Sequence, residues 1–301
     1  MKITRLNNRA AAFLIGPALT AMFVVHLIPI FFGIIMAFLR IDVSNLSDFP
    51  RVPFIGFDNF KYLFTDGSGV GQRFLSSIGN VLIYGLVTIP VGYVIALAVA
   101  MLLNREFKGR TIVRGLILLP YITPDAVMYN VWRFIFQSRV GIVNSILSGL
   151  GLIREPIIWL VGDNALIAVI VASIWKGWPF TSLMLLAALQ TIPQDLYEAA
   201  RLDNASWFQR LRYVTLPMLW PVSRTLLMLS VIWNFHAFNQ FYVMLGADTA
   251  SKAAVPSVVI LREAFGTLHF GSGSAMAVIM LAIILLLTAI AVFTKRERSV
   301  E

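Results

Sequence analysis

The chain of 301 residues contains no cysteine, only three histidines and few charged residues. Without thiols it can form no disulfide bond, thiolate metal site or cysteine nucleophile. The histidines, His26, His236 and His269, are too scattered in sequence to form a ligand cluster. The motifs GxxxxGK[ST], HExxH and GxSxG are also missing, which removes the usual signs of an ATPase, a zinc peptidase and a serine hydrolase. We therefore expect no enzyme active site, metal or cofactor in this chain.

Charged residues make up 13% of the chain and hydrophobic residues 58%, a balance outside the range of soluble domains. No charged residue occurs between Arg9 and Arg40 or between Arg73 and Arg105, and each gap can hold a helix of about 20 residues. A β-barrel is excluded because its strands would alternate in polarity. The sequence predicts an all-α polytopic membrane protein with six helices, near 11–38, 76–103, 112–136, 164–190, 223–246 and 273–294. The first run is too long for a signal peptide and is expected to be retained.

Lysine and arginine in the connecting segments predict the orientation. With the N-terminus inside, the inner segments hold 14 basic residues and the outer segments 8, the latter matched by 8 acidic residues. Both termini are therefore expected in the cytoplasm. The net charge of +9 is explained by inner segments that face an anionic leaflet, without a nucleic-acid partner.

The segment "IPQDLYEAARLDNASWFQRLRYVTLPMLWP", between the fourth and fifth predicted spans, carries charge and good helix formers. Asn204 is suited to a left-handed turn, and Ser206 with Gln209 predicts a capping box that starts a second helix. We expect two short helices joined by a sharp turn and ended by Pro217 and Pro221. From the residues alone, this pair is either a cap on the membrane surface or a docking site for a cytoplasmic partner.

The same segment resembles the EAA loop of ABC-importer permeases. The matching positions are Glu198, Ala199, Ala200, Asp203, Ala205, Leu216 and Pro217, with Asn204 in place of the family's glycine. Further similarity to the carbohydrate-uptake branch (maltose, trehalose, oligosaccharide and glycerol-phosphate importers) lies in "FIGFDNFKYLF", "LILLPYITPDAV", "GIVNSIL" and "IWKGWPFTSLMLLAALQ". The outer segment "LGADTASKAAVPS" departs from the Gly-Gly-Pro composition usual there.

The resemblance implies a single permease domain over 1–301, the first of two paired permease subunits, with a core at about 70–294, a coupling loop at about 191–222 and an extra N-terminal helix. It also implies three partners: a second permease, a cytoplasmic ATPase dimer that binds ATP and Mg²⁺, and an extracytoplasmic solute-binding protein. Residues 198–200 and 203–205 would couple to the ATPase, and Glu198 matches a position that meets a basic residue there. The implied location is the inner or cell membrane of a bacterium or archaeon.

Polar residues within the predicted spans indicate a substrate pathway, because a polar group in a membrane must face protein or water. On a continuous helix, Trp233, His236 and Gln240 share one face and Asn234 and Asn239 lie off it. An aromatic ring beside hydrogen-bonding groups suits a sugar, whereas the alternative is interhelical hydrogen bonding. The resemblance adds Tyr121, Ser173, Lys176, Gly177 and Phe180 to the pathway.

Lys176 leaves two possibilities open. Its ammonium group could bind an anionic solute, or it could be satisfied within the protein, by pairing among the charges of Asp125, Arg133 and Lys176, by a backbone carbonyl, or by reaching the membrane interface. Two other functions remain alternatives to a sugar importer. One is a secondary transporter, for which no inverted repeat is evident and Asp125 is the only carboxylate within a span. The other is a permease for a different solute, such as glycerol 3-phosphate. A membrane scaffold without a transport role is a further alternative, which would explain the spans and the loop but not the face suited to a sugar.

Overall fold

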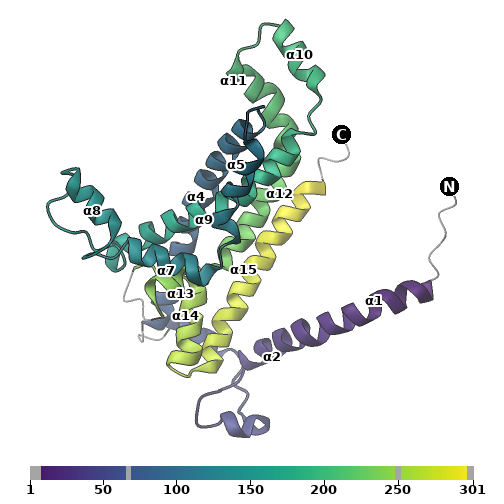
Figure 1. Ribbon diagram of the computed structural model, residues 1–301. Helices are drawn as coiled ribbons and strands as arrows, with labels where there is room; N and C mark the ends of the chain where they lie inside the picture. The colour runs from purple at the N-terminus through teal and green to yellow at the C-terminus, as the bar shows by residue number, and fades with distance from the viewer. Residues whose placement is uncertain (1–7, 66–68, 248–251, 297–301) are drawn as a thin grey trace. The chain divides into compact units, whose positions relative to one another are not determined.

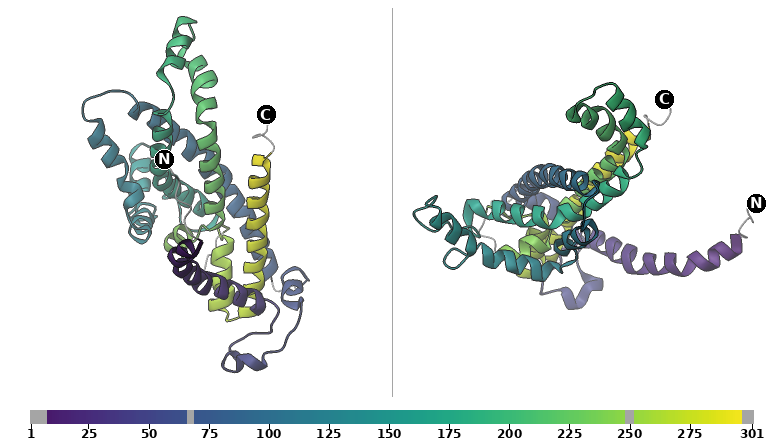
Figure 2. Two further views of the ribbon diagram at one scale, coloured as in Figure 1. Left: turned by 90° about the vertical axis from the view of Figure 1, so that its right-hand side faces the viewer. Right: turned by 45° about the horizontal axis from the view of Figure 1, so that its top comes forward.

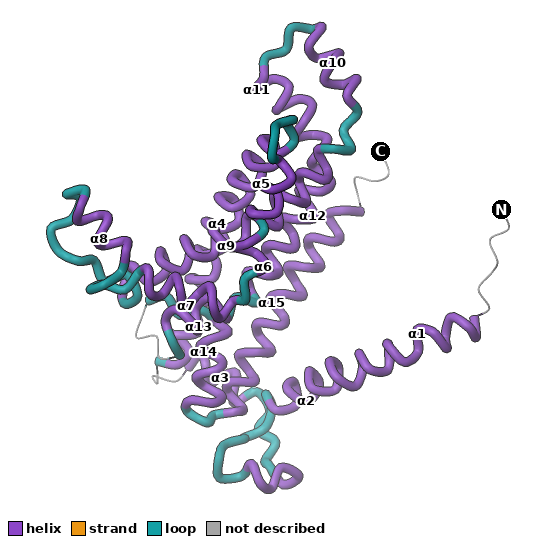
Figure 3. The backbone as a smooth tube through the Cα atoms, viewed as in Figure 1, coloured by secondary structure: helices purple, strands orange, loops and turns teal. Residues whose placement is uncertain are grey.

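The computed structural model describes residues 8–65, 69–247 and 252–296, and within them the chain is helix and loop without a strand (Figures 1 and 3). Three of the lysines and arginines counted for the orientation lie outside these residues, namely Lys2, Arg5 and Arg298. The centre of the outer segment "LGADTASKAAVPS" also lies outside them. The helices are α1 (Asn8–Met22), α2 (Ile28–Met36), α3 (Asp58–Thr65), α4 (Val70–Leu103), α5 (Arg110–Ile117), α6 (Leu119–Ile122), α7 (Asp125–Ile135), α8 (Ile142–Gly149), α9 (Ala165–Leu189), α10 (Gln194–Leu202), α11 (Trp207–Arg210), α12 (Leu216–Phe235), α13 (Asn239–Leu245), α14 (Pro256–Leu261) and α15 (Phe270–Arg296).

Six apolar spans are present in the described part of the chain, if one bent pair counts as a single span. Five are continuous: Phe13–Met36, Val70–Leu103, Gly162–Leu189, Trp207–Phe235 and Phe270–Ile290. The sixth is the pair Arg110–Ile122 and Asp125–Ile135, bent by 87°. The predicted all-α membrane fold is confirmed. The third span is nevertheless not the straight helix expected over 112–136, because Pro124 cannot donate a backbone hydrogen bond and disfavours helix in the residue before it.

The fifth span also differs from the prediction of a helix over 223–246. The helix begins at Trp207, runs through Pro217 and Pro221, and ends at Phe235. A π-helical turn at Leu211–Thr215 precedes the first proline and accommodates the break in the hydrogen-bond pattern. The expectation that the two prolines end the loop helices before this span was therefore wrong.

The chain divides into two compact units, the first formed by residues up to Gln72 together with Ile260–Ile283. Here the motif "FIGFDNFKYLF" has a structural role. Asn59 on α3 donates hydrogen bonds from Nδ2 to the carbonyl oxygens of Ala37 and Leu39, each at 2.9 Å. Phe38 packs against the rings of Phe57 and Phe60. The motif thus fixes the chain that follows α2. In that segment, hydrogen bonds from the hydroxyl and the N–H of Ser44 lower the pKa of Asp42.

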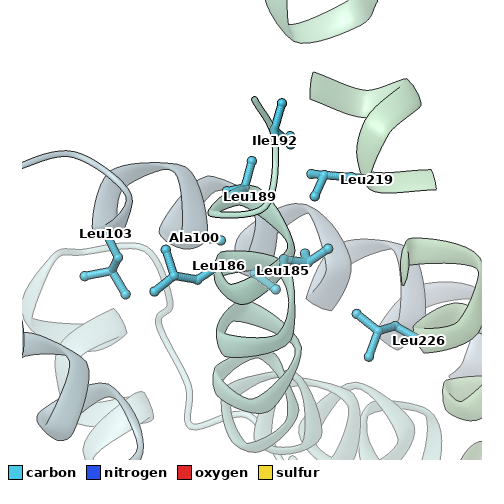
Figure 4. Close-up of a cluster of buried hydrophobic side chains, with 9 residues drawn as sticks. Ala100, Leu103, Leu185, Leu186, Leu189, Ile192, Leu219 and Leu226 are labelled. Atoms are coloured by element: carbon cyan, nitrogen blue, oxygen red, sulfur yellow. The ribbon is translucent and has the colours of Figure 1, made fainter. Parts of the chain in front are cut away.

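The second unit contains Arg73–Val259 and the end of α15 from Ile284. Its hydrophobic cluster joins the C-terminal half of α4 to α9 and α12 (Figure 4). Ala96 and Ala100 are fully buried and let the helices approach closely, while Leu185 and Leu219 fill the space between them. Packing of these three helices fixes the frame on which the candidate site is built.

Candidate substrate cavity and coupling hairpin

A cavity of about 340 Å³ lies within the second unit. Its walls come from α4, the bent pair α6 and α7, α9, and the segment α12–α13. The lining residues are Tyr84, Thr88, Ile89, Gly92, Tyr93, Tyr121, Asp125, Tyr129, Ser173, Ile174, Lys176, Gly177, Trp178, Phe180, Thr181, Leu226, Leu227, Ser230, Trp233, Asn234 and Gln240. The size is within the range of small-molecule binding sites.

Three aromatic rings from three different elements form a continuous row in this cavity. Tyr121 stacks on Phe180 with ring centroids 5.1 Å apart, and Phe180 meets Trp233 edge-on at 5.9 Å. Trp233 is 53% exposed, so much of its ring is free to contact a solute. Gly177, one turn before Phe180 on α9, has no neighbouring atom within 4 Å of the place a Cβ would occupy. The row therefore presents an apolar surface beside open space.

A polar cluster adjoins the row at the break between α6 and α7. Lys176 Nζ lies 2.9 Å from Asp125 Oδ1 and donates to the carbonyl oxygen of Thr123 at 2.8 Å. Asn239, the first residue of α13, donates from Nδ2 to Asp125 Oδ2 at 3.0 Å. Lys176 is thus paired, as one of the two possibilities for this residue predicted.

Amide groups of the fifth span contact α4 on the opposite wall. Gln240 Nε2 donates to the hydroxyl of Tyr84 at 3.1 Å. Asn234 Nδ2 donates to the carbonyl oxygen of Val81 at 2.9 Å. The contact is close because Gly85 has no side chain, since a Cβ there would lie 2.5 Å from Asn234 Nδ2. Asn234 therefore holds α12 against α4.

Of the eight residues predicted for the substrate pathway, seven line the cavity: Tyr121, Ser173, Lys176, Gly177, Phe180, Trp233 and Gln240. His236 does not line it, and its Nδ1 lies 2.9 Å from the carbonyl oxygen of Ile232. The helix is interrupted between Phe235 and Asn239, so the single face expected from helical spacing does not exist. For the same reason Asn234, predicted to lie off that face, is one of the lining residues.

The sequence analysis overlooked the wall formed by α4. Tyr84, Thr88 and Tyr93 all line the cavity from this helix, and Tyr93 is hydrogen-bonded to Ser223 on α12 at 2.6 Å. Tyr84 and Thr88 are four positions apart and fall close to one helical stripe in an otherwise apolar span, whereas Tyr93, nine positions from Tyr84, lies off that stripe. That pattern is a signal in the sequence for a polar face directed into the protein.

The predicted turn of the coupling loop is present at the tip of the hairpin formed by α10 and α11 (Figures 1 and 2). Asn204 has a φ of 55°, in the left-handed region. Ser206 and Gln209 form the expected capping box, in which Gln209 N–H donates to Ser206 Oγ and Ser206 N–H donates to Gln209 Oε1. The hairpin base is tied by a 3.0 Å hydrogen bond between Tyr197 and Thr215.

The surface of this hairpin is unusually apolar for a solvated loop. Leu202 is 83% exposed, and Trp207, Phe208 and Tyr213 are exposed as well. Glu198, Ala199, Asp203 and Asn204 are also exposed, while Ala200 and Ala205 are partly covered. Exposed large apolar side chains grouped on one segment are typical of a protein interface.

The left-handed turn provides a test of the hairpin. Valine at Asn204 should strain the turn by about 1–2 kcal/mol, whereas glycine should be tolerated. Limited tryptic cleavage of the full chain next to Arg201 and Arg212 measures how often the hairpin opens. We expect the Asn204→Val variant to be cleaved roughly five to thirty times faster than the unmodified protein. Asn204→Gly is the matched control, and equal cleavage of all three proteins would show that the turn is not under this constraint.

Six apolar spans, four of which contribute residues to one cavity, and an exposed helical hairpin between the fourth and fifth are the architecture of an importer's membrane-embedded permease. The chain belongs to the family described as the binding-protein-dependent transport system inner membrane component, whose pattern matches residues 88–298. It is 32% identical over 279 residues to the trehalose/maltose transport system permease protein MalF of Thermococcus litoralis, covering 92% of this chain and 90% of that protein. It is 29% identical to the sn-glycerol-3-phosphate transport system permease protein UgpA of Brucella abortus, covering 96% of this chain and 95% of that one.

Solved structures agree on the fold. A chain of a bacterial ABC transporter that imports the acidic polysaccharide alginate superposes with a TM-score of 0.80 at 23% identity, covering 97% of this chain and 98% of that one. A chain of an alginate transporter in complex with an alginate pentasaccharide-bound periplasmic protein superposes with a TM-score of 0.78 at 22% identity, covering 96% of each chain. This membrane subunit is a permease with the fold of type I ABC importers.

Proposed function

We propose that this protein is a permease subunit of an ATP-driven sugar importer and forms half of its translocation pathway. The observation that carries the proposal is the cavity in which Tyr121, Phe180 and Trp233 form an aromatic row beside hydrogen-bonding groups. Aromatic faces pack against the C–H face of a sugar, and amides and hydroxyls bind its hydroxyl groups. The similarity to a trehalose/maltose permease supports the same substrate class.

The proposed assembly contains a second, homologous permease, a cytoplasmic ATPase dimer and an extracytoplasmic solute-binding protein. The exposed hairpin α10–α11 docks on the ATPase through Glu198, Ala199, Ala200 and the turn at Asp203–Ala205, and closure of the ATPase dimer moves it. ATP and Mg²⁺ bind the ATPase, and this chain needs no cofactor of its own. Both termini face the cytoplasm, with the protein in the inner or cell membrane, as the distribution of lysine and arginine favours.

The relatives leave two solute classes to distinguish, since one is named for trehalose and maltose and another for glycerol 3-phosphate. The direct test extracts the tagged full chain from its own membranes in mild detergent, identifies the bound subunits by mass spectrometry, and reconstitutes the complex in vesicles. We expect a second permease, an ATPase and uptake of a labelled disaccharide that requires ATP on the hairpin side. Uptake driven by an ion gradient without ATP would reject the proposal.

The aromatic row gives a second prediction. Trp233→Ala removes an exposed ring from the cavity and should lower the apparent affinity for the disaccharide about tenfold, which corresponds to roughly 1.4 kcal/mol. Trp220→Ala is the matched control, because Trp220 lies on the same helix α12, is 52% exposed and does not line the cavity. Uptake titrations on assembled complex measure both variants. If the Trp220 variant loses as much affinity as the Trp233 variant, the loss comes from helix packing and not from the cavity.

A further inference from the structure

The polar end of the cavity lies where two spans are interrupted. The third span breaks between Ile122 and Asp125, and the fifth breaks between Phe235 and Asn239. Asp125 and Asn239 are the first residues of the helices that resume after these breaks, α7 and α13. They are hydrogen-bonded to each other at 3.0 Å. Lys176 reaches this junction from α9, which is continuous.

All three N–H groups of the Lys176 ammonium have an acceptor within the protein. The acceptors are Asp125 Oδ1 at 2.9 Å and the carbonyl oxygens of Thr123 at 2.8 Å and Tyr121 at 3.4 Å. The side chain of Lys176 is 15% exposed, whereas that of Asp125 is 41% exposed. A solute in the cavity can therefore reach the Asp125 carboxylate more readily than the Lys176 ammonium. The N–H groups of that ammonium are already used in hydrogen bonds within the protein.

Among the described residues that line the cavity, these two are also the only acidic and basic side chains. Their charges cancel, so the lining carries no net charge. An anion would have to approach a partly exposed carboxylate without a free cation to compensate, which is unfavourable in surroundings of low dielectric constant. A hydroxyl group has no such cost, because it can donate to Asp125.

We propose that the Lys176–Asp125 pair is a specificity determinant that makes the pathway neutral and selects uncharged polyhydroxylated solutes over anionic ones. This rests on the proposed function and narrows its substrate class to neutral sugars. Lys176 also has a positioning role, since it binds the carbonyl groups that the break in the third span leaves without helical partners. Asp125 joins both interrupted spans to α9 through its two oxygens.

The absence of cysteine allows a direct measurement of the potential in the cavity. A single cysteine at Ser230, which lines the cavity on α12, is introduced into the full chain in lipid nanodiscs. Its reaction rates with an anionic and a cationic methanethiosulfonate reagent are compared, each normalised to the rate for a free thiol. In the otherwise native protein we expect the anion-to-cation ratio to lie within about threefold of one. Asp125→Asn should raise the ratio about tenfold or more, and Lys176→Met should lower it by a similar factor.

Two further variants complete the test. The double variant Asp125→Asn with Lys176→Met removes both charges and should return the ratio to its native value. Asp163→Asn is the matched control, because Asp163 forms an ion pair of 2.7 Å with Lys252 in exposed segments that do not line the cavity, and it should leave the ratio unchanged.

Several outcomes would overturn the proposal. A native ratio that favours the anionic reagent tenfold would show that Lys176 acts as an available cation. An unchanged ratio in Asp125→Asn would show that the pair does not set the potential. If cysteines at Ser230 and at Thr181, a second lining position, both fail to react, the cavity is closed to solutes. The measurement uses neither ATP nor partner subunits, so its failure is distinguishable from failure of the proposed importer function.

Discussion

Replacing Gly177 with leucine is expected to reduce sugar uptake by at least about tenfold while the complex remains assembled. Gly177 lines the cavity, and the position of its missing Cβ is open space. A leucine side chain would project into that space beside the ring of Phe180 and leave less room for a solute. A tenfold loss corresponds to only about 1.4 kcal/mol, which a single crowded contact can cost. Initial uptake rates in vesicles loaded with ATP measure the effect.

Gly79→Leu is the matched control for this variant. Gly79 lies within helix α4, has no atom within 4 Å of its Cβ position, and does not line the cavity. The control should transport normally, which would show that leucine in an unobstructed helical position is tolerated. If both variants transport normally, the cavity is not the pathway. Loss of subunits from the Gly177 variant alone would instead assign that position to an interface.

Reversing the charge of Glu198 is expected to release the ATPase. Glu198 is exposed on α10 beside the apolar residues of the hairpin, where it is available for a charge-assisted hydrogen bond with a basic group of a partner. Lysine would replace attraction with repulsion, at a cost of about 2–5 kcal/mol, or at least roughly thirtyfold in affinity. The amount of ATPase that co-purifies with the tagged chain measures docking, and ATP-driven uptake should fall in parallel.

Glu155→Lys makes the same charge change on an exposed residue in the segment between α8 and α9. It should retain the ATPase, because the proposed orientation places it on the other side of the membrane. Circular dichroism of both variants should show unchanged helix content. Retention of ATPase and normal uptake in Glu198→Lys would remove the docking role assigned to this residue.

The spans and the loop tip could be predicted from the sequence because their signals are local. A charge-free run predicts a membrane helix from its own composition, and the Asn204 turn with its capping box is specified within six residues, 204–209. The resemblance to known permeases then supplied five of the residues that the fold brings together in one cavity, and helical spacing supplied Trp233 and Gln240. Their role in transport remains a prediction.

The details that could not be predicted depend on contacts between distant segments. Proline marked the break at Thr123–Pro124, but Pro217 and Pro221, which suggest breaks equally well, lie in a continuous helix. The interruption after Phe235 has no proline or glycine as a signal. It is accompanied by pairings such as Asn239 with Asp125 and Ser257 with the carbonyl group of Ala237, over 114 and 20 positions in sequence. Helical spacing was counted across that interruption, so it predicted His236 in the pathway and Asn234 off it. In the structure Asn234 lines the cavity and His236 does not.

The uninterrupted helix Trp207–Phe235 has a mechanical consequence. At about 1.5 Å per residue its 29 residues span roughly 43 Å, so one helix extends from the hairpin to the cavity wall at Trp233. A rod that tilts by about 10° around its midpoint moves each end by roughly 4 Å, in opposite directions. A displacement of the hairpin is therefore transmitted along this helix toward the aromatic row, and the helix can bend at the π-helical turn Leu211–Thr215, at Pro217 and Pro221, and at the gap after Phe235.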